Sequence, residues 1–428
     1  MSVRHIPDTS FGMWQEFHMS EKYLAQKNIL LGVTGSIAAY KAADLASKLT
    51  QAGALVDVIL TRSALEFITP LTFQSVTGRP VFTDKALWGA EAHVLHVGLG
   101  HSADMFVIAP ATANTIARLA NGLADNLLVL AGLSFGPGST DRPFLVAPAM
   151  DGGMLNHPAT RANLEVLRSR GAVIIGPDVG HLASGLEARG RMSEPATLLG
   201  HIRFLLTRHG PLQGRCVVIT AGGTQEPVDP VRLLTNRSSG KQGYALAQAA
   251  LDAGAQVTLV STPVSLLAPQ GAQLIQVTSA AEMEAAVIKA CQKADILVMA
   301  AAVADYRPAW KATQKIKKDS GMPSLELERT ADILLEVAKL REQTGSPKII
   351  VGFAAETQDM LANATTKLKA KRLDMIVAND VSSSTSGFSV DTNQVTLLMA
   401  GGQSVELPLM SKAEVADRLI AEIVKLLK

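Results

Sequence analysis

Residues 217–247 read VVITAGGTQEPVDPVRLLTNRSSGKQGYALA, and this stretch decides the fold. A buried strand is expected over Cys216–Thr220, followed by a turn at Gly222-Gly223 and a long polar loop. A helix is expected to begin near Gly243. A strand, a glycine turn and a helix in this order form the anion-binding corner of a doubly wound α/β sheet, where backbone N–H groups at the helix start face a phosphate.

The first half of the chain repeats this pattern. Asn28–Val33 is predicted as a strand, Ile37–Gln51 as a helix, and Val56–Thr61 as the next strand. The turn between the first strand and the helix carries Gly35-Ser36. Strands that alternate with helices indicate parallel sheets. We therefore expect two Rossmann-like α/β domains, the first flavodoxin-like, and not one large sheet, because each half has its own glycine turn.

The domain boundaries follow from the repeat. We expect an N-terminal extension over residues 1–27, a first domain over 28–212 and a second over 213–428. The join falls in the turn-forming run His209–Gly214. The extension has no signal-peptide core, and Met1 and Met19 are both candidate start residues.

Composition limits the classes of function. Hydrophobic residues make up 47% of the 428 residues, so the chain can bury a large core. The net charge is +2 without a long run of one sign, which gives no reason to expect nucleic-acid binding. No run reaches the roughly 18 apolar residues of a membrane-spanning helix. Two cysteines form no disulfide framework, so we expect a cytoplasmic protein.

Small and hydroxyl-bearing residues follow three strands of the first half. A helix start there can hold a phosphate. The dinucleotide pattern G-x-G-x-x-G is absent, which favours a mononucleotide over NAD and argues against a nicotinamide dehydrogenase. His93 and His96 are candidate proton carriers near neutral pH, although such histidines are more often structural. The segments concerned are Gly35-Ser36, Thr61–Ala64 and Ala109–Thr115.

Five motifs of the first half resemble the flavin-dependent cysteine decarboxylases: GVTGSIAAYKA, TRSALEFI, HVGLG, APATANTIARLANGLADNLL and APAMDGGM. In that family FMN oxidises a cysteinyl thiol, and the neighbouring carboxylate is then lost. The resemblance implies FMN as cofactor and His96 as the active-site histidine. It also implies that FMN contacts Gly35, Ser36, Ser63, Thr112 and Asn114.

Two residues depart from the family pattern. Asp151 stands where the family has asparagine, and Ser184 stands where the family has a proton-donating cysteine. Serine is a far weaker acid than cysteine, whose pKa is near 8.5. Three interpretations stay open: a working variant with another acid such as Asp151 or water, a domain that stops at the oxidised enethiol, and a structural domain.

The second half concentrates polar groups after its strands. The loop over Thr220–Arg232 is expected to be continuous, and its hydroxyls, glycines and guanidinium suit phosphate and carboxylate recognition. Asp305 follows a strand and is a candidate metal or nucleotide contact, with Lys311, Lys315, Lys317 and Lys318 shortly after it. No G-x-x-x-x-G-K-[ST] loop is present, so the nucleotide site must be spread over several strand ends.

The motifs ITAGGTQEPVDPVR, TNRSSGKQGYALA, MAAAVADYRP, KIKK, VGFAAET, VANDV and LPLMSK closely resemble phosphopantothenate–cysteine ligases. The resemblance implies that CTP activates 4′-phosphopantothenate as an acyl-cytidylate with Mg²⁺, and that the amine of cysteine then displaces CMP. Asn236 would hold the acyl-cytidylate, and Lys315 would act as a catalytic residue at the nucleotide. Asp305 would contact both the nucleotide and the metal. The remaining implied CTP contacts are Ala331, Asp332, Ile333, Leu334, Phe353, Lys367 and Lys371.

Both resemblances together indicate a bifunctional enzyme of coenzyme A biosynthesis, whose ligase product feeds the flavin half. They imply trimers of the flavin half and dimers of the ligase half, which would combine into a homo-dodecamer. The expected partners are small molecules, with no nucleic acid and no membrane. The rival interpretations are an active ligase with a flavin domain of incomplete turnover, and a flavoprotein scaffold or regulatory subunit.

Overall fold

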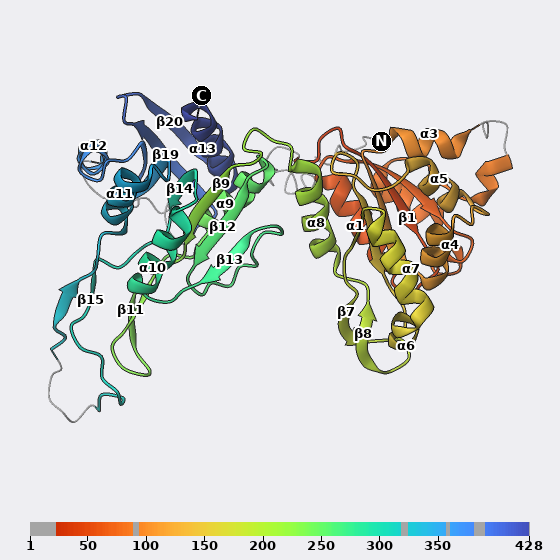
Figure 1. Cartoon of the computed structure of the whole chain (residues 1–428), viewed down its shortest axis with the longest axis horizontal. Coiled ribbons are helices and arrows are strands. Elements are labelled where there is room, and N and C mark those ends of the chain that lie inside the picture. Colours follow the sequence, from red (N-terminus) through yellow and green to blue (C-terminus); the bar gives the residue numbers. More distant parts are fainter. Residues whose placement is uncertain (1–22, 89–93, 318–323, 357–359, 381–389, 428) are drawn as a thin grey trace, which may run out of the picture.

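A computed structural model describes residues 23–88, 94–317, 324–356, 360–380 and 390–427 of the chain. It contains two main sheets, which Figure 1 shows in separate lobes with helix α8 (Pro195–Thr207) beside the connection. The predicted α/β class with two doubly wound units is confirmed. The predicted boundary between residues 212 and 213 falls between α8 and the next strand, and it stays a prediction. The extension before residue 23, with both candidate start residues, lies outside the described residues.

The first sheet has six parallel strands in the order β3-β2-β1-β4-β5-β6. Successive side chains of a strand point to opposite faces. Ile29 and Leu31 of β1 accordingly pack on one face of the sheet and Leu30 on the other. Helices α1 and α8 cover the first face, and α4, α5 and α7 cover the second. The strands are β1 (Asn28–Val33), β2 (Leu55–Leu60), β3 (Val81–Phe82), β4 (Met105–Ala111), β5 (Phe144–Pro148) and β6 (Ala172–Ile174).

The helices of this half follow the strands closely. Helix α1 begins at Ala39, two residues later than predicted, because Ser36–Ala38 form a turn first. A hairpin of β7 (Asp178–His181) and β8 (Glu187–Arg191) stands apart from the main sheet. The helices are α1 (Ala39–Gln51), α2 (Pro70–Thr77), α3 (Leu95–Ser102), α4 (Ala113–Asn121), α5 (Leu127–Phe135), α6 (Gly152–Asn156) and α7 (Pro158–Ser169), with short 3-10 turns at Ala64–Glu66 and Asp84–Trp88.

The second sheet has eight strands in the order β13-β12-β9-β14-β17-β18-β19-β20. Its first six strands are parallel, and a C-terminal hairpin adds β19 and β20 antiparallel at one edge. Val217 and Ile219 pack under α9 and α13, whereas Val218 packs under the helices of the opposite face. The strands are β9 (Cys216–Ala221), β12 (Gln256–Ser261), β13 (Gln273–Gln276), β14 (Ile296–Met299), β17 (Ile349–Glu356), β18 (Met375–Asp380), β19 (Thr392–Met399) and β20 (Ser404–Ser411).

One prediction about this half is wrong in detail. The polar loop after β9 is not continuous, because β10 (Gln225–Pro227) pairs antiparallel with β11 (Leu233–Thr235). A second small hairpin joins β15 (Tyr306–Pro308) to β16 (Leu327–Arg329), and both hairpins lie below the sheet in Figure 1. The helices are α9 (Lys241–Asp252), α10 (Ala280–Cys291), α11 (Ile333–Thr344), α12 (Met360–Ala370) and α13 (Lys412–Leu426).

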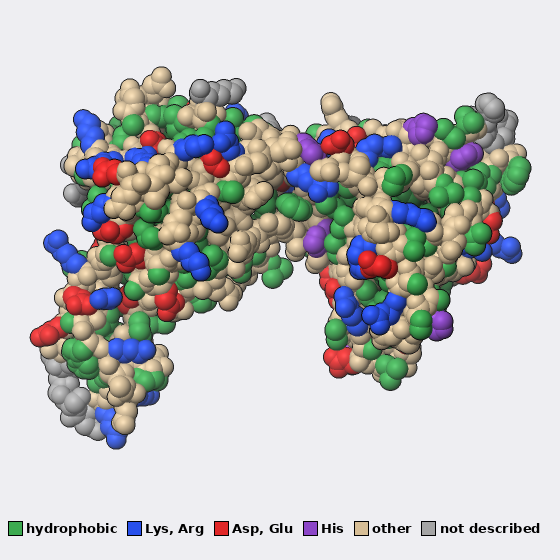
Figure 2. Space-filling view, in the orientation of Figure 1, with side chains coloured by type: hydrophobic (Ala, Val, Ile, Leu, Met, Phe, Trp, Pro, Cys, Tyr) green, Lys and Arg blue, Asp and Glu red, His purple; other side chains and the backbone are tan. Residues whose placement is uncertain are grey.

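The two lobes touch through α8 and α9. Arg203 of α8 forms an ion pair with Asp252 of α9, and its guanidinium stacks 3.7 Å over the ring of Tyr23. Charged and apolar side chains mix over the face shown in Figure 2, in agreement with the small net charge. Among the described residues no helix combines the length and the apolar character needed to cross a membrane.

Candidate functional site

A cavity of about 1010 Å³ opens at the carboxyl ends of β14 and β17 in the second half. Residues from segments far apart in the sequence line it, as expected for a site without a P-loop. Most of the predicted ligase residues lie here. They are Asn236, Asp305, Ala331, Asp332, Ile333, Leu334, Phe353, Lys367 and Lys371.

The strand-to-helix turn of the opening motif forms one wall of the cavity. Gly240 has a φ of +75° and precedes α9, which begins at Lys241. A side chain at Gly243 would lie 2.6 Å from Cβ of Ala221, so only glycine lets the first turn of α9 approach β9 this closely. The side-chain amide of Asn236 donates a hydrogen bond to the carbonyl of Ala302 at 3.1 Å. The turn therefore brings backbone N–H groups and a carboxamide to one place.

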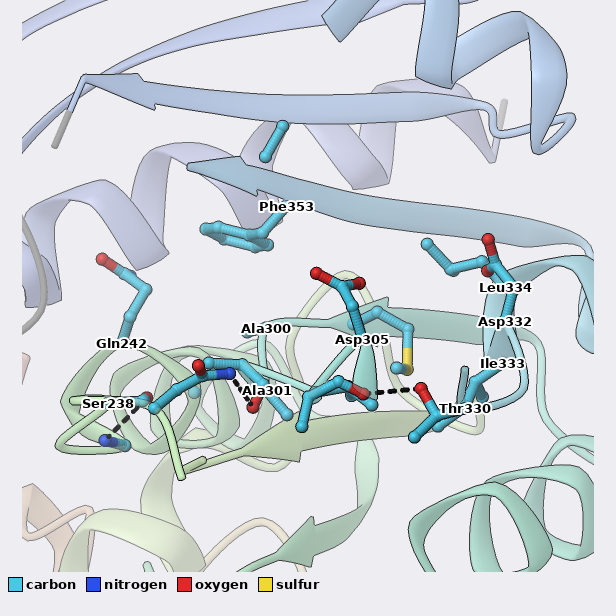
Figure 3. Close-up of a pocket in the computed structure, with 18 of the residues that line it drawn as sticks. Ser238, Gln242, Ala300, Ala301, Asp305, Thr330, Asp332, Ile333, Leu334 and Phe353 are labelled. Carbon is cyan, nitrogen blue, oxygen red and sulfur yellow. Dashed lines mark hydrogen bonds between the residues drawn. The ribbon is translucent and has the colours of Figure 1, made fainter. Parts of the chain in front are cut away.

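Buried threonines fix the segment that ends at Asp305. Thr224 is fully buried, and its hydroxyl oxygen accepts a hydrogen bond from the backbone N–H of Ala304 at 2.9 Å. The hydroxyl of Thr330 donates to the carbonyl of Ala304 at 2.6 Å. Figure 3 shows the Asp305 carboxylate projecting into the cavity on the side of the Phe353 ring. The carboxylate is thus held at the centre of the site by bonds to its neighbour in the chain.

The opposite wall is the start of α11. Asp332 caps this helix by accepting a weak hydrogen bond from the N–H of Leu335 at 3.4 Å, and its other carboxylate oxygen lies 2.9 Å from the ammonium of Lys371. Lys371 follows the last residue of α12, whereas Lys367 lies within that helix. Lysines, a helix start and the half-buried Phe353 ring form a surface that suits an anionic nucleotide with a flat base.

Lys315 is not among the residues that line the cavity. The segment around it is held at the β10–β11 hairpin, because the N–H of Ile316 donates to Asp229 at 3.2 Å. Asp229 also accepts hydrogen bonds from the N–H groups of Val231 and Arg232, each at 2.8 Å. Burial opposes ionisation of Asp229, but these three backbone donors outweigh it and lower its pKa. Lys311 and Lys317 belong to the same segment, and Lys318 lies outside the described residues.

Other residues that line the cavity were not predicted as site residues, among them Lys241, Gln242, Asn393 and Lys412. Lys241 and Lys412 are the first residues of α9 and α13. Their sequence signals were the lysines within TNRSSGKQG and LPLMSK, 171 positions apart, which only the fold brings together.

In the first half, predicted flavin contacts lie around the ends of adjacent strands. A side chain at Gly35 would meet Cβ of Ser63 at 2.4 Å, so the turns after β1 and β2 touch and require glycine. The hydroxyl of Thr34 donates to the carbonyl of Pro110 at 2.7 Å and accepts from the N–H of Thr112 at 3.1 Å. These bonds tie the end of β1 to the end of β4, where the strand order reverses, and ligands of doubly wound sheets bind at such reversals.

The donor set at this edge fits FMN. The hydroxyls of Ser36, Ser63 and Thr112 and the N–H groups of the turn after β1 can bind a phosphate. Ile37 and Tyr40 are each 62% exposed beside them and offer apolar surface for a ring. Asn114 lies in the first turn of α4, exposed, and its side-chain oxygen accepts from Arg118 at 3.2 Å.

His96 is half-buried in the first turn of α3, which begins after Val94 in a left-handed conformation with a φ of +59°. A valine with positive φ is unusual, because its branched side chain crowds the backbone there. His93, the other candidate histidine, lies outside the described residues.

The two residues that depart from the decarboxylase pattern contact each other. The Ser184 hydroxyl donates a hydrogen bond to Oδ2 of Asp151 at 2.8 Å, and the N–H of Gly153 donates to Oδ1 at 2.8 Å. These bonds, the one from Gly153 first, lower the pKa of Asp151. The carboxyl is therefore ionised near neutral pH and acts as an acceptor. This geometry argues against Asp151 as the replacement acid.

The donor set for a metal is sparse. No group of three or more histidine, cysteine, aspartate or glutamate side chains that could hold a metal ion occurs within the described part of the chain. Mg²⁺ is commonly bound through one or two carboxylates together with substrate phosphates. Asp305 in the cavity could serve as such a carboxylate, with the remaining ligands supplied by the substrate phosphates and not by a closed cage of protein side chains.

Known protein families and relatives match nearly the whole chain. Residues 18–206 match the Flavoprotein family, and residues 212–427 match the family described as DNA/pantothenate metabolism flavoprotein C-terminal domain. The coenzyme A biosynthesis bifunctional protein CoaBC of Bacillus subtilis (strain 168) is 46% identical over 408 residues, which cover 95% of this chain and 98% of that protein.

Two solved structures are similar to the separate halves. The C-terminal domain of a coenzyme A biosynthesis bifunctional protein CoaBC is 41% identical, with a TM-score of 0.44, and covers 51% of this chain and 98% of its own. A mutant PPC decarboxylase complexed with pantothenoylaminoethenethiol is 36% identical, with a TM-score of 0.37, and covers 42% of this chain and 97% of its own.

Proposed function

The chain belongs to the family of bifunctional coenzyme A biosynthesis proteins, and from that premise we propose that its second half joins 4′-phosphopantothenate to cysteine with CTP. Its first half would then decarboxylate the product to 4′-phosphopantetheine. The family makes the chain an enzyme with a ligase and a decarboxylase role. The use of CTP and the residue roles below are our proposal.

The ligase would work in two steps. The substrate carboxylate attacks the α-phosphorus of CTP, the bond to the β-phosphate breaks, and pyrophosphate leaves. The cysteine amine then attacks the acyl carbon, CMP leaves, and a proton passes to solvent. The observation that carries this proposal is the cavity itself, which gathers Asn236, Asp305 and Phe353 from three separate segments.

Each residue has a role that its position supports. The Asn236 carboxamide can donate to an oxygen of the acyl-cytidylate once it leaves the carbonyl of Ala302. The Phe353 ring would stack on the cytosine, while Lys367 and Lys371 would bind phosphates. Mg²⁺, held by Asp305 and the nucleotide, would offset the negative charge of the triphosphate. Lys315 would need to leave its hairpin, or to serve the cavity of a second copy, before it could contact CTP.

The ligase proposal is tested by product analysis. The protein with 4′-phosphopantothenate, cysteine and CTP should release CMP and pyrophosphate in equal amounts and form the amide. Omission of cysteine should stop CMP release. Release of CMP without cysteine and without an amide would refute the proposed sequence of steps.

In the first half we propose that bound FMN supplies the two-electron oxidation of the cysteinyl thiol and later returns the electrons. Ser36, Ser63 and Thr112 would hold its phosphate, and Gly35 and Asn114 would lie against it. His96 would carry a proton at the reacting thiol. Purified protein should be yellow, and a colourless protein that cannot be reconstituted with FMN would refute this assignment.

The hydrogen bond between Ser184 and Asp151 bears on the last step, in which an enethiol must gain a proton. An ionised Asp151 cannot give one, and the Ser184 proton is already donated to that carboxylate. We therefore assign the final proton to water. The product formed from 4′-phosphopantothenoylcysteine decides the outcome by mass spectrometry: phosphopantetheine supports full turnover, whereas a product two hydrogens lighter means that reduction fails.

The same hydrogen bond favours a second candidate function, an active ligase fused to a domain that stops at the oxidised enethiol. Unchanged substrate in the same experiment would instead favour a structural or regulatory flavoprotein scaffold. We also propose a cytoplasmic homo-oligomer, with a dodecamer as the assembly that trimers of one half and dimers of the other would form. Its mass in solution tests this proposal.

A further inference from the structure

The cavity of the second half has a cationic end that the proposed roles do not use. Figure 3 shows Gln242 on one side of the cavity and Asp332 on the other, with Asp305 and Phe353 between them. Lys241 and Lys412 line the cavity together with Gln242. Lys371, one of the nucleotide contacts proposed above, forms an ion pair with Asp332 on the opposite side.

Two helices begin side by side at this end. The side-chain amide of Gln242, in the first turn of α9, donates to the backbone carbonyl of Lys412 at 3.1 Å. Lys412 is the first residue of α13, and the two helices pack against each other in the core. The start of a helix carries the positive end of the helix dipole. Helix α9 has no side-chain cap there, whereas Ser411 and Glu414 form a capping box at the start of α13. Two such starts therefore direct positive potential to the same part of the cavity.

Two ammonium groups add full charges there. Lys412 is only 6% exposed, and its ammonium donates to the carbonyl of Val390 at 2.6 Å. Lys241 lies 2.6 Å from the carboxylate of Asp391, which is 86% exposed. Burial, and then the nearby charge of Lys241, lower the pKa of Lys412, and Asp391 only partly offsets this. An anion in the cavity would add to the interactions that stabilise the charged forms of Lys241 and Lys412.

We propose that Lys241, Gln242 and Lys412 form a binding site for a phosphate group of a ligase substrate. The proposal rests on the proposed ligase function, whose two substrates both carry phosphate. The group is either part of the triphosphate of CTP or the phosphomonoester of 4′-phosphopantothenate. Both present oxygens that ammonium groups and helix N–H groups bind. The cavity then has cations at both ends, one end for each of two phosphate-bearing segments.

The test replaces Lys412 by methionine, which keeps the length of the side chain and removes its charge. Binding is measured by titration calorimetry with four ligands: CTP, CMP, 4′-phosphopantothenate and pantothenate. Lys412→Met should weaken one phosphate-rich ligand about tenfold or more, the lower range for a hydrogen bond to a charged group, and leave its phosphate-poor analogue unchanged. A loss for CTP but not CMP assigns the triphosphate, and a loss for phosphopantothenate but not pantothenate assigns the phosphomonoester.

Two further variants make the outcome unambiguous. Lys425 lies on the same helix α13, where it is exposed and paired with Glu422. The control variant Lys425→Met should therefore bind all four ligands as the wild type does. Lys241→Met removes the less buried cation and should affect the same ligand as Lys412→Met, so a folding defect at Lys412 does not remove the test.

Several results would overturn the proposal. Wild-type affinity of both lysine variants for every ligand would do so, as would equal losses for a ligand and its phosphate-poor analogue. If the wild type makes the amide from CTP while the variants bind normally, only this inference fails. A wild-type protein that binds neither CTP nor 4′-phosphopantothenate would refute the proposed ligase function as well.

Discussion

Thr224→Val should destabilise the centre of the ligase site although it barely changes the shape of the side chain. Thr224 is fully buried, and its hydroxyl is the acceptor for the N–H of Ala304, which is itself 7% exposed. Valine leaves that N–H without its partner, and water has little access to replace it. An orphaned buried donor costs about 1–3 kcal/mol. Because Ala304 precedes Asp305, part of this free energy should appear as weaker binding of CTP.

Thr224→Ser is the matched control. Serine keeps the hydroxyl and removes one buried methyl group, which costs about 0.5–1.5 kcal/mol, as for Ile→Val. Its effect should be limited to stability, with CTP affinity close to that of the wild type. For valine the upper limit on the loss of CTP affinity is about 5- to 150-fold, the same 1–3 kcal/mol expressed as a dissociation constant.

Two measurements check the order of the variants. Hydrogen exchange of the amides in residues 300–305 should speed up in Thr224→Val, because exchange reports local opening. Titration calorimetry should rank CTP affinity as wild type, then Thr224→Ser, then Thr224→Val. Equal CTP affinity for the two variants, or faster exchange in serine than in valine, would refute the claim that this one hydrogen bond positions Asp305.

Three other perturbations test separate parts of the chain. Phe353→Ala should raise the dissociation constant of CTP about 5- to 150-fold, because aromatic stacking on a base is worth about 1–3 kcal/mol, and an unchanged constant in calorimetry would exclude stacking. Burial raises the pKa of Cys291 to about 12, so iodoacetamide at pH 8 should label the half-buried Cys216 first; equal labelling in peptide mass spectrometry would contradict this. The hydrogen bond from Lys41 lowers the pKa of Glu194, so this pair stabilises the fold above pH about 4.3 and the contribution is lost as pH falls through the lowered pKa. Lys41→Met should therefore lower the urea midpoint of unfolding more at pH 7 than at pH 3. Equal changes at the two pH values would contradict the stabilising role of the Lys41–Glu194 ion pair.

The fold could be predicted because its signals are local. Each half repeats a strand, a glycine turn and a helix within about 30 residues, a span typical of one βαβ unit. The β10–β11 hairpin was missed because Gln225–Pro227 and Leu233–Thr235 are too short, and in part too polar, to show alternation. Helix α9 begins at Lys241, two residues before the predicted start near Gly243, because Gly240 adopts a positive φ and ends the loop there.

The residues of the candidate site that could be predicted are those whose sequence motif lies close to a strand or to the start of a helix. Asp305 lies in the segment after β14, Phe353 lies in β17 and Asp332 caps α11. Their meeting in one cavity follows from the parallel sheet. Lys412 was missed because its role depends on the packing of α13 against α9, which no local pattern encodes. No local pattern shows where Lys315 lies either. Its segment is anchored by the buried carboxylate of Asp229, which is 87 positions from Ile316 in the sequence.

Asp151 and Ser184 are best understood as a matched pair, and this leads to a last prediction. A cysteine introduced alone at Ser184 would face the Asp151 carboxylate, and a nearby negative charge raises a thiol pKa and makes the thiol a poorer proton donor near neutral pH. Ser184→Cys alone should therefore barely increase phosphopantetheine formation, whereas Ser184→Cys with Asp151→Asn should increase it well beyond the sum of the single changes. Asp151→Asn alone keeps an acceptor for the serine hydroxyl and should leave the rate near that of the wild type. Rates come from mass spectrometry of the product, and the visible spectrum of each variant controls for retained flavin. If Ser184→Cys alone gave the full increase, the carboxylate would not control the proton donor, and the pairing argued from the 2.8 Å hydrogen bond would be wrong.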